Sequence, residues 1–153
     1  MGETIAQNRR ARHDYTIEDT FEAGIVLRGT EIKSIRAHKV SLADAYARIE
    51  KDEAWIIGLH IAPYESTDVR FNHEPKRARK LLLHREEIDE LLGRTKAKGL
   101  TIVPLEIYIT DGGKAKVRLG LARGKQSWDR RREIADRESK RDIAREMADA
   151  RRR

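Results

Sequence analysis

The histidines of this chain, the residues most often used in catalysis, show no spacing typical of an active site. None has the i, i+4 partner that a helical zinc site needs, and the five lie far apart: His13, His38, His60, His73 and His84. Cysteine is absent, and neither a G-x-S-x-G nucleophile motif nor a G-x-x-x-x-G-K-[ST] phosphate loop occurs. We therefore expect that this protein is not an enzyme and that it binds no metal, cofactor or small-molecule substrate. A metal-free nuclease that uses His13 and a lysine is the alternative.

The basic residues favour a polyanionic partner. Lysine and arginine number 33 against 26 acids, a net charge of +7, and they gather at residues 9–12, 33–36, 76–80 and 124–153. Aromatic residues make up only 5% of the chain, too few for a row of base-stacking side chains. This composition favours a folded RNA that is recognised through its backbone and shape.

The apolar pattern argues against a membrane partner. No run approaches the roughly 18 apolar residues that a spanning helix needs, and the first 15 residues lack a secretory hydrophobic region. The absence of cysteine fits a reducing compartment. We expect a cytoplasmic protein.

Alternating apolar residues predict an antiparallel β protein. A long strand begins at Tyr15, with Glu22 on its polar face, a bulge expected near Asp19 and a bend at Gly24. Two strands, a loop, a helix and a hairpin are expected further along, at 42–50, 55–61, 62–75, 84–98 and 103–121, and a short helix follows Gly29. Lys116 and Arg118 face outward on the second hairpin strand.

This order of elements predicts the domain organisation. We expect a mainly β fold, an OB-like antiparallel Greek-key barrel with two to three helices, over residues 1–123. Its first 12 residues are expected to form a basic arm. Residues 124–153 are expected to form a separate basic tail.

The tail cannot form a core of its own. It carries eleven lysines and arginines against seven acids, a net +4, and beyond Trp128 only Ile134, Ile143 and Met147 are large and apolar. Neither Gly nor Pro follows its first residue, and Ala, Arg, Glu and Met form helices well. We predict a tail that is loose when free and helical on a polyanion. A solvated surface helix is the alternative.

Segments along nearly the whole chain resemble the SsrA-binding protein family, also called small protein B. In family order these are IAQNRRARHDY (5–15), FEAGIVLRGTEIKSIR (21–36), SLADAY (41–46), PKRARKLLLH (75–84), GLT (99–101) and ARGKQSWDRR (122–131). FEAGIVLRGTEIKS followed by RKLLL at this distance is highly specific.

The resemblance implies binding to the tRNA-like domain of transfer-messenger RNA (tmRNA). Together with elongation factor Tu, that complex enters the empty A site of a stalled ribosome, where trans-translation tags the nascent chain and frees the ribosome. The resemblance also implies that the protein itself makes and breaks no covalent bond. From the residues alone, a general single-stranded nucleic-acid binder on an OB fold remains the alternative.

The resemblance places the RNA-binding surface at Asn8, Glu22 and Leu82. Asn8 can donate and accept hydrogen bonds at a base or sugar edge, and Glu22 can accept from a base amino group or hold an arginine. Leu82 could pack on an unstacked base, with ordinary core burial as the alternative. Phosphate contact and electrostatic approach are assigned to Arg9, Arg10, Arg12, His13, Lys33 and Arg36.

For the tail, the resemblance implies a role on the ribosome, as a helix in the vacant mRNA channel near the decoding centre of the small-subunit rRNA. The family's Gly-Lys and Asp-Lys-Arg motifs match here, although Arg130 stands where lysine is usual and Gln126 where a second lysine is common. The residues expected to act on the ribosome are Gly124, Lys125, Trp128, Asp129, Arg130, Arg131, Arg132, Arg137, Lys140 and Arg141.

Overall fold

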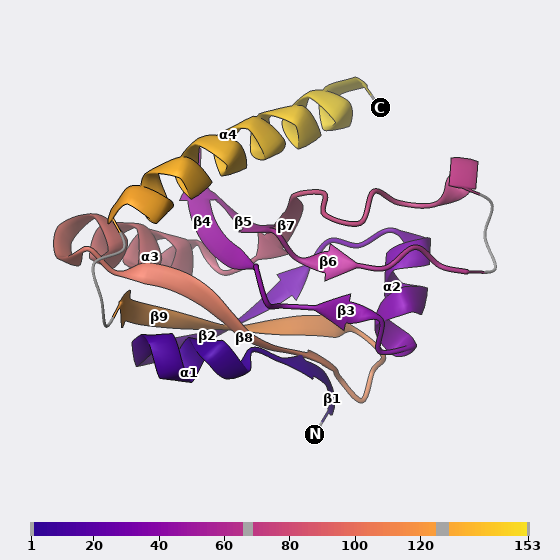
Figure 1. The fold of residues 1–153 in the computed structure, drawn as a ribbon, viewed down its shortest axis with the longest axis horizontal. Helices are drawn as coiled ribbons and strands as arrows, with labels where there is room; N and C mark the ends of the chain where they lie inside the picture. The colour runs from indigo at the N-terminus through magenta and orange to yellow at the C-terminus, as the bar shows by residue number, and fades with distance from the viewer. Residues whose placement is uncertain (1, 66–68, 125–128, 153) are drawn as a thin grey trace.

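The computed structural model describes residues 2–65, 69–124 and 129–152 (Figure 1). The strands are β1 (Glu3–Gln7), β2 (Tyr15–Ile25), β3 (Val40–Ser41), β4 (Tyr46–Glu50), β5 (Glu53–Ile57), β6 (His60–Ile61), β7 (Arg79–Leu82), β8 (Thr101–Ile109) and β9 (Ala115–Gly124). The helices are α1 (Arg9–Asp14), α2 (Gly29–Arg36), α3 (Arg85–Lys98) and α4 (Asp129–Arg152), with a 3-10 turn, η1 (Val69–Phe71).

The strands close into an antiparallel barrel, as predicted. Neighbours follow the order β8, β4, β5, β7, β2, β9, and β9 pairs back to β8, while β1 adds to the free side of β8. Every pairing is antiparallel. The main core fills the barrel with inward side chains from β2, β5, β8 and β9, and it includes Phe21, Ile56, Ile107 and Leu119. The prediction of a mainly β, OB-like fold is confirmed.

The bulge expected near Asp19 lies between Ile17 and Asp19, where the register of β2 against β9 shifts. One extra residue reverses the side to which the following side chains point. Phe21 therefore enters the main core, whereas Ile17 packs on the opposite face, against α1. Uninterrupted apolar alternation from Tyr15 predicts that both residues share one face; that prediction is wrong, because the bulge divides the strand into two halves.

The first 12 residues do not form an arm. Residues Glu3–Gln7 pair with β8 as β1, and residues Arg9–Asp14 form α1, whose Ala11 is buried against Val103, Leu105 and Ala122. The sequence pattern misled because this segment buries few side chains. Its order comes from the strand ladder, from Ala11 facing the barrel, and from Ile5 and Ala6, which are partly buried against the main core.

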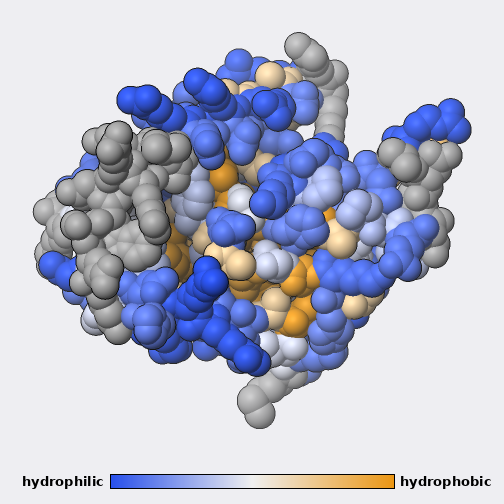
Figure 2. Space-filling view, viewed as in Figure 1, coloured by the Kyte–Doolittle hydropathy of each residue, from blue (hydrophilic) through white to orange (hydrophobic). Residues whose placement is uncertain are grey.

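Helices cover separate parts of the barrel surface. In Figure 1, α1 lies beneath β2, β8 and β9, whereas α4 crosses β4 and β5 on the opposite side. Hydrophilic side chains predominate on the face shown in Figure 2, and hydrophobic ones are visible mainly across the middle of the view. None of the helices in the described part of the chain is both long and apolar enough to cross a membrane.

Candidate RNA-binding surface

Two adjacent rows of side chains stand on the outer face of the barrel, across strands β7, β2, β9 and β8. Phe21 and Ala23 point into the core, so Glu22 and Gly24 point outward. The strand register then sets the partners across the sheet: Glu22, Arg118 and Glu106 form one row, and Leu82, Gly24, Lys116 and Tyr108 form the other. We call these seven residues the outer-face patch.

Arg118 stands between two carboxylates and bonds to one of them. Its Nε donates to Glu106 Oε1 at 3.1 Å, and its guanidinium carbon lies 5.6 Å from the centre of the Tyr108 ring, a cation–π contact. Glu22, on the other side, is exposed and has no ion-pair partner among the described residues. The Glu22 carboxylate therefore retains acceptor capacity for a group from outside the protein.

The hydroxyl group of Tyr108 is buried beneath these charges. The residue is 9% exposed, and its oxygen has no hydrogen-bond partner of good geometry in the described ranges. Burial, followed by the adjacent Glu22 carboxylate, raises the pKa of Tyr108 to about 12, and Arg118 opposes this rise. Tyr108 is therefore a neutral hydroxyl donor next to Glu22 throughout the physiological pH range.

Leu82 is a surface residue, because 53% of it is exposed. It pairs with Gly24, and a Cβ added to that glycine would lie 3.3 Å from the Leu82 Cβ and 3.7 Å from the Lys116 Nζ. The missing side chain at Gly24 leaves room there for both neighbours. Leu82 therefore presents an apolar surface beside Glu22 and a lysine ammonium group, and the alternative of ordinary core burial is wrong.

The basic residues of α1 form a second part of the surface. Asn8 precedes the helix and donates from Nδ2 to the Pro104 carbonyl oxygen at 3.0 Å, which fixes its side chain. Asn8, Arg9 and Arg10 line an open groove between residues 4–10 and 40–43. Arg12 and His13 are exposed on the same helix, and His13 Nδ1 lies 2.9 Å from Asp14 Oδ1.

Lys33 and Arg36 belong to a different region. They lie on α2, which Figure 1 shows at the other end of the barrel from α1. The Lys33 ammonium lies 5.4 Å from the centre of the Tyr64 ring, and Arg36 Nη2 donates to the Gly113 carbonyl oxygen at 3.5 Å. The structure therefore does not bring these two residues together with those of α1.

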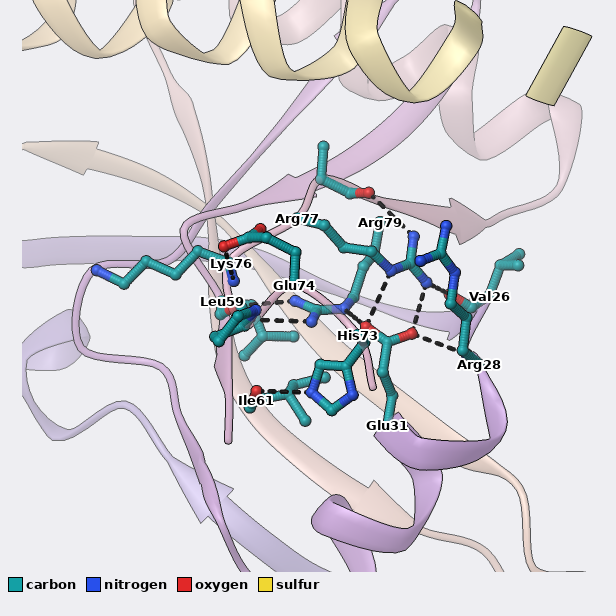
Figure 3. A network of polar contacts seen from close by, with 12 residues as sticks. Val26, Arg28, Glu31, Leu59, Ile61, His73, Glu74, Lys76, Arg77 and Arg79 are labelled. Carbon is teal, nitrogen blue, oxygen red and sulfur yellow. Dashed lines mark hydrogen bonds and ion pairs between the residues drawn. The ribbon is translucent and has the colours of Figure 1, made fainter. Parts of the chain in front are cut away.

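The basic residues at 76–80, predicted as a surface cluster, differ in burial: the arginines are largely buried and the lysines are accessible. Arg79 is fully buried and Arg77 nearly so, and both converge on the buried carboxylate of Glu31, as Figure 3 shows. Arg77 Nε donates to Glu31 Oε2 at 3.0 Å, and Arg79 Nη1 donates to the Leu59 carbonyl oxygen at 2.7 Å. We call Glu31, Arg77 and Arg79 the buried charge cluster.

This cluster has a structural role. Burial by itself raises the pKa of Glu31, but the hydrogen bond from Arg77 and the charge of Arg79 outweigh it, so the net pKa lies below the ordinary value. Only Lys76 and Lys80 remain accessible at this site, paired with acids at 4.0 and 3.4 Å. The prediction of a basic RNA-binding cluster at 76–80 is therefore wrong for its arginines.

The tail forms the 24-residue helix α4, which packs against the barrel. Ile143 is 1% exposed and lies in a cluster with Trp55, Ile57 and Ala78, and Met147 packs against it. These contacts explain why both faces of β5 are buried. The prediction of a tail that is loose when free is wrong for this structure.

Two polar contacts add to the docking of α4. Arg48 Nη1 donates to the buried Ser139 Oγ at 2.6 Å, and Arg77 Nη1 donates to Glu146 Oε2 at 3.3 Å. The second contact connects α4 to the buried charge cluster. With Ile143 and Met147, these serine and glutamate side chains form one stripe at helical spacing, a pattern that composition alone did not reveal.

The tail residues expected to act on the ribosome fall into four groups. Gly124 ends β9, opposite Tyr15. Lys125 and Trp128 lie outside the described residues, whereas Asp129, Arg130, Arg131 and Arg132 belong to the first turns of α4. Arg137, Lys140 and Arg141 are exposed on the helix, Lys140 beside the docking stripe and the two arginines away from it.

Sequence reasoning missed part of the outer-face patch. It placed Lys116 and Arg118 on an outward face without giving them a role, and it did not single out Tyr108. The signal was the hairpin turn, in which Gly113 N donates to the Thr110 carbonyl oxygen at 2.9 Å. Counting back from that turn puts Tyr108 opposite Lys116, in the row that contains Leu82.

The described residues contain no candidate metal site. Within residues 2–65, 69–124 and 129–152, no three His, Asp or Glu side chains are grouped closely enough to hold a metal ion. What the surface offers is hydrogen-bond donors and acceptors, positive charge and one exposed leucine, which suits recognition of a polyanion.

Most of the chain is similar to proteins of one known family. The family model described as SmpB protein matches residues 5–149. The SsrA-binding protein of Listeria welshimeri is 56% identical over 144 residues, which cover 94% of this chain and 92% of the relative. The SsrA-binding protein of Bacillus cytotoxicus is 55% identical over 148 residues, with coverage of 97% and 94%.

A solved structure is similar over most of the fold. It is a chain from a study entitled "tmRNA-SmpB: a journey to the center of the bacterial ribosome", with a TM-score of 0.67 and 55% sequence identity. The match covers 80% of this chain and 85% of that one. From the family model, the identities and this fold, the chain belongs to the SmpB family of SsrA-binding proteins.

Proposed function

We propose that this protein is a tmRNA-binding ribosome-rescue factor of trans-translation. It binds the tRNA-like domain of tmRNA with the outer-face patch and α1, and with elongation factor Tu it delivers the RNA to the A site of a stalled ribosome. The names of its relatives and of the matching structure support this proposal. The protein acts in the cytoplasm, and it makes and breaks no covalent bond.

The observation that carries the proposal is the position of Glu22 and Leu82. These residues are far apart in the sequence, yet they lie in neighbouring rows of one exposed face, beside the cations of Lys116 and Arg118. A carboxylate can accept from a base edge, the leucine can pack on a base, and the cations can contact phosphates.

A general single-stranded RNA binder is less well supported. Such proteins stack successive bases on aromatic side chains. Tyr108 is the only aromatic residue of the outer-face patch, it is 9% exposed, and Arg118 already covers its ring. The patch is therefore suited to one or a few extruded bases of a folded RNA.

The tail is assigned to the ribosome. The face of α4 opposite its docking stripe carries Arg137, Arg141 and Arg145, and Lys140 lies beside the stripe; all four are exposed. Such a basic face is suited to the phosphates of rRNA lining an empty mRNA channel. Use of the whole helix there requires that it leave the barrel.

A truncated chain tests this division of labour. Because β9 pairs with β2 as far as Gly124, the cut belongs after that residue. Compared with the full chain, the shortened protein should bind tmRNA with nearly unchanged affinity but fail to support tagging on ribosomes stalled on an mRNA without a stop codon. Loss of most of the RNA affinity would contradict the division.

Incubation of the full-length protein with labelled RNA should leave the RNA intact, and cleavage would support the nuclease alternative.

A further inference from the structure

The tail helix α4 docks on the barrel through a small apolar contact. Its buried Ile143 packs on Trp55 and Ile57 of β5, and Ala78, just before β7, completes the cluster. The indole Nε1 of Trp55 is buried without a hydrogen-bond partner in the described part of the chain. An unsatisfied buried N–H destabilises the state that contains it. The docked state is therefore held by one cluster that also carries a polar cost.

The polar contacts of α4 fall on arginines that have a second partner on the barrel. Arg77 donates from Nη1 to Glu146 Oε2 at 3.3 Å and from Nε to Glu31 Oε2 at 3.0 Å; the second contact is drawn in Figure 3. Arg48 donates to a serine of α4 at 2.6 Å, and its Nη2 lies 3.0 Å from Glu50 of β4. When α4 leaves, each arginine retains a barrel carboxylate, so no buried charge loses its last partner. The barrel side of this interface is suited to reversible separation.

Docking on the barrel and binding in the mRNA channel exclude each other. The stripe that contains Ile143 and Met147 is packed on β5, and Figure 1 shows α4 lying across β4 and β5. The barrel therefore occupies one side of the helix, whereas the proposed function places rRNA around it. The protein has to exist in a closed state, with α4 docked, and an open state, with α4 released.

We propose that the docked α4 is an autoinhibited state of the tail: the outer face of β5 retains the helix until a ribosome with an empty mRNA channel binds it. This inference rests on the proposed function, which assigns the tail to the ribosome, and adds an intramolecular competitor for the same helix. A ligand that binds only the open state has its apparent affinity reduced by the fraction of the protein that is open. Docking thus lowers the affinity of a basic tail for the many other RNA phosphates that it would bind if it were always free.

A single thiol beneath α4 measures the two states. The chain has no cysteine, so Ala78→Cys introduces one thiol at a site that is 1% exposed and packed near Ile143. Such a thiol reacts with a maleimide only when the site opens. In the free full-length protein, labelling should be about 10- to 100-fold slower than at Ala37→Cys, the exposed end of α2, because roughly 1–10% of the protein is open.

A second substitution in the tail shows whether α4 is what covers the thiol. Ile143→Ala, combined with Ala78→Cys, should raise the labelling rate to nearly that of Ala37→Cys. The control Glu138→Ala, at an exposed position of α4, should leave labelling slow. Circular dichroism verifies that each variant is folded. Fast labelling of Ala78→Cys with an otherwise unchanged tail, or slow labelling that Ile143→Ala does not accelerate, would overturn the closed state.

The same thiol reports on the tail when the protein is bound to a ribosome. Full-length Ala78→Cys protein in complex with tmRNA is delivered with elongation factor Tu to ribosomes stalled at the end of a truncated mRNA. Labelling of this chain should then be about 10- to 100-fold faster than in the free complex. Ribosomes whose mRNA fills the channel should leave it slow. Equal labelling rates on the two kinds of ribosome would overturn autoinhibition that an empty channel relieves.

The outcomes separate this proposal from the function on which it rests. If the tail is needed for tagging but Ala78→Cys is labelled equally fast in every state, the autoinhibited state is wrong and the rescue function stands. If the chain cut after Gly124 still supports tagging, the ribosomal role of the tail fails and autoinhibition fails with it.

Discussion

Replacing Ile143 by alanine should release the tail helix from the barrel. The side chain is 1% exposed and packs against Trp55, Ile57 and Ala78. Truncation of a buried isoleucine to alanine costs about 2–5 kcal/mol. Full burial of Ile143 contributes about 1.5–3 kcal/mol and the half-buried Met147 contributes less, before the entropy of ordering is subtracted, so the loss removes most of what holds α4 in place.

Trp55 provides the assay. The chain has two tryptophans, and Trp128→Phe leaves Trp55, which is 6% exposed, as the only one. In this background, Ile143→Ala should shift the emission to longer wavelength and increase quenching by acrylamide. Arg145→Ala, on the exposed side of the same helix, is the matched control and should change neither signal. Equal quenching of Ile143→Ala and its parent would refute the packing of α4 on Trp55.

Further predictions concern the buried charge cluster and the outer-face patch. Glu31→Gln leaves two buried guanidinium groups without their carboxylate and should lower the free energy of unfolding by about 3–5 kcal/mol in urea titrations, whereas Glu65→Gln, at an exposed pair, should leave it nearly unchanged. Because the pKa of folded Glu31 lies below its ordinary value of 4.5, its contribution is fully present above that pH and is lost as the pH falls through the lowered folded value. A wild-type stability that is flat down to pH 3, or equal in slope to that of Glu31→Gln, would contradict this. Leu82→Ala should keep the fold and lower tmRNA affinity roughly 5- to 30-fold in gel shifts, and an unchanged affinity would remove Leu82 from the RNA surface.

The sequence was informative where one residue type determines the local structure. The bulge near Asp19, the hairpin within 103–121 and the end of the helix expected over 84–98, where Gly99 has a φ of +63°, all lie where they were predicted. The exposure of Glu22 followed directly from strand alternation. These features depend on local backbone geometry, which a single sequence contains.

Other features depended on which distant residues meet. Arg79 resembles a surface residue in a basic run, and only the carboxylate of Glu31 on α2 makes its burial possible. Likewise, Ile143 is an isolated apolar residue in a charged helix, and its burial depends on the outer face of β5. To predict that Leu82, Lys116 and Tyr108 lie in one row, one must know the register of three strand pairs.

The most direct test of the account is a binding competition at fixed salt concentration. Labelled tRNA-like domain of tmRNA, bound to the full-length protein, is displaced either by the same unlabelled domain or by an unstructured RNA of equal length. We predict that the folded domain competes at far lower concentration, because the outer-face patch and α1 read shape and single bases in addition to phosphate charge. Equal competition by the two RNAs would show that binding is only electrostatic and would contradict assignment of this chain to ribosome rescue through tmRNA.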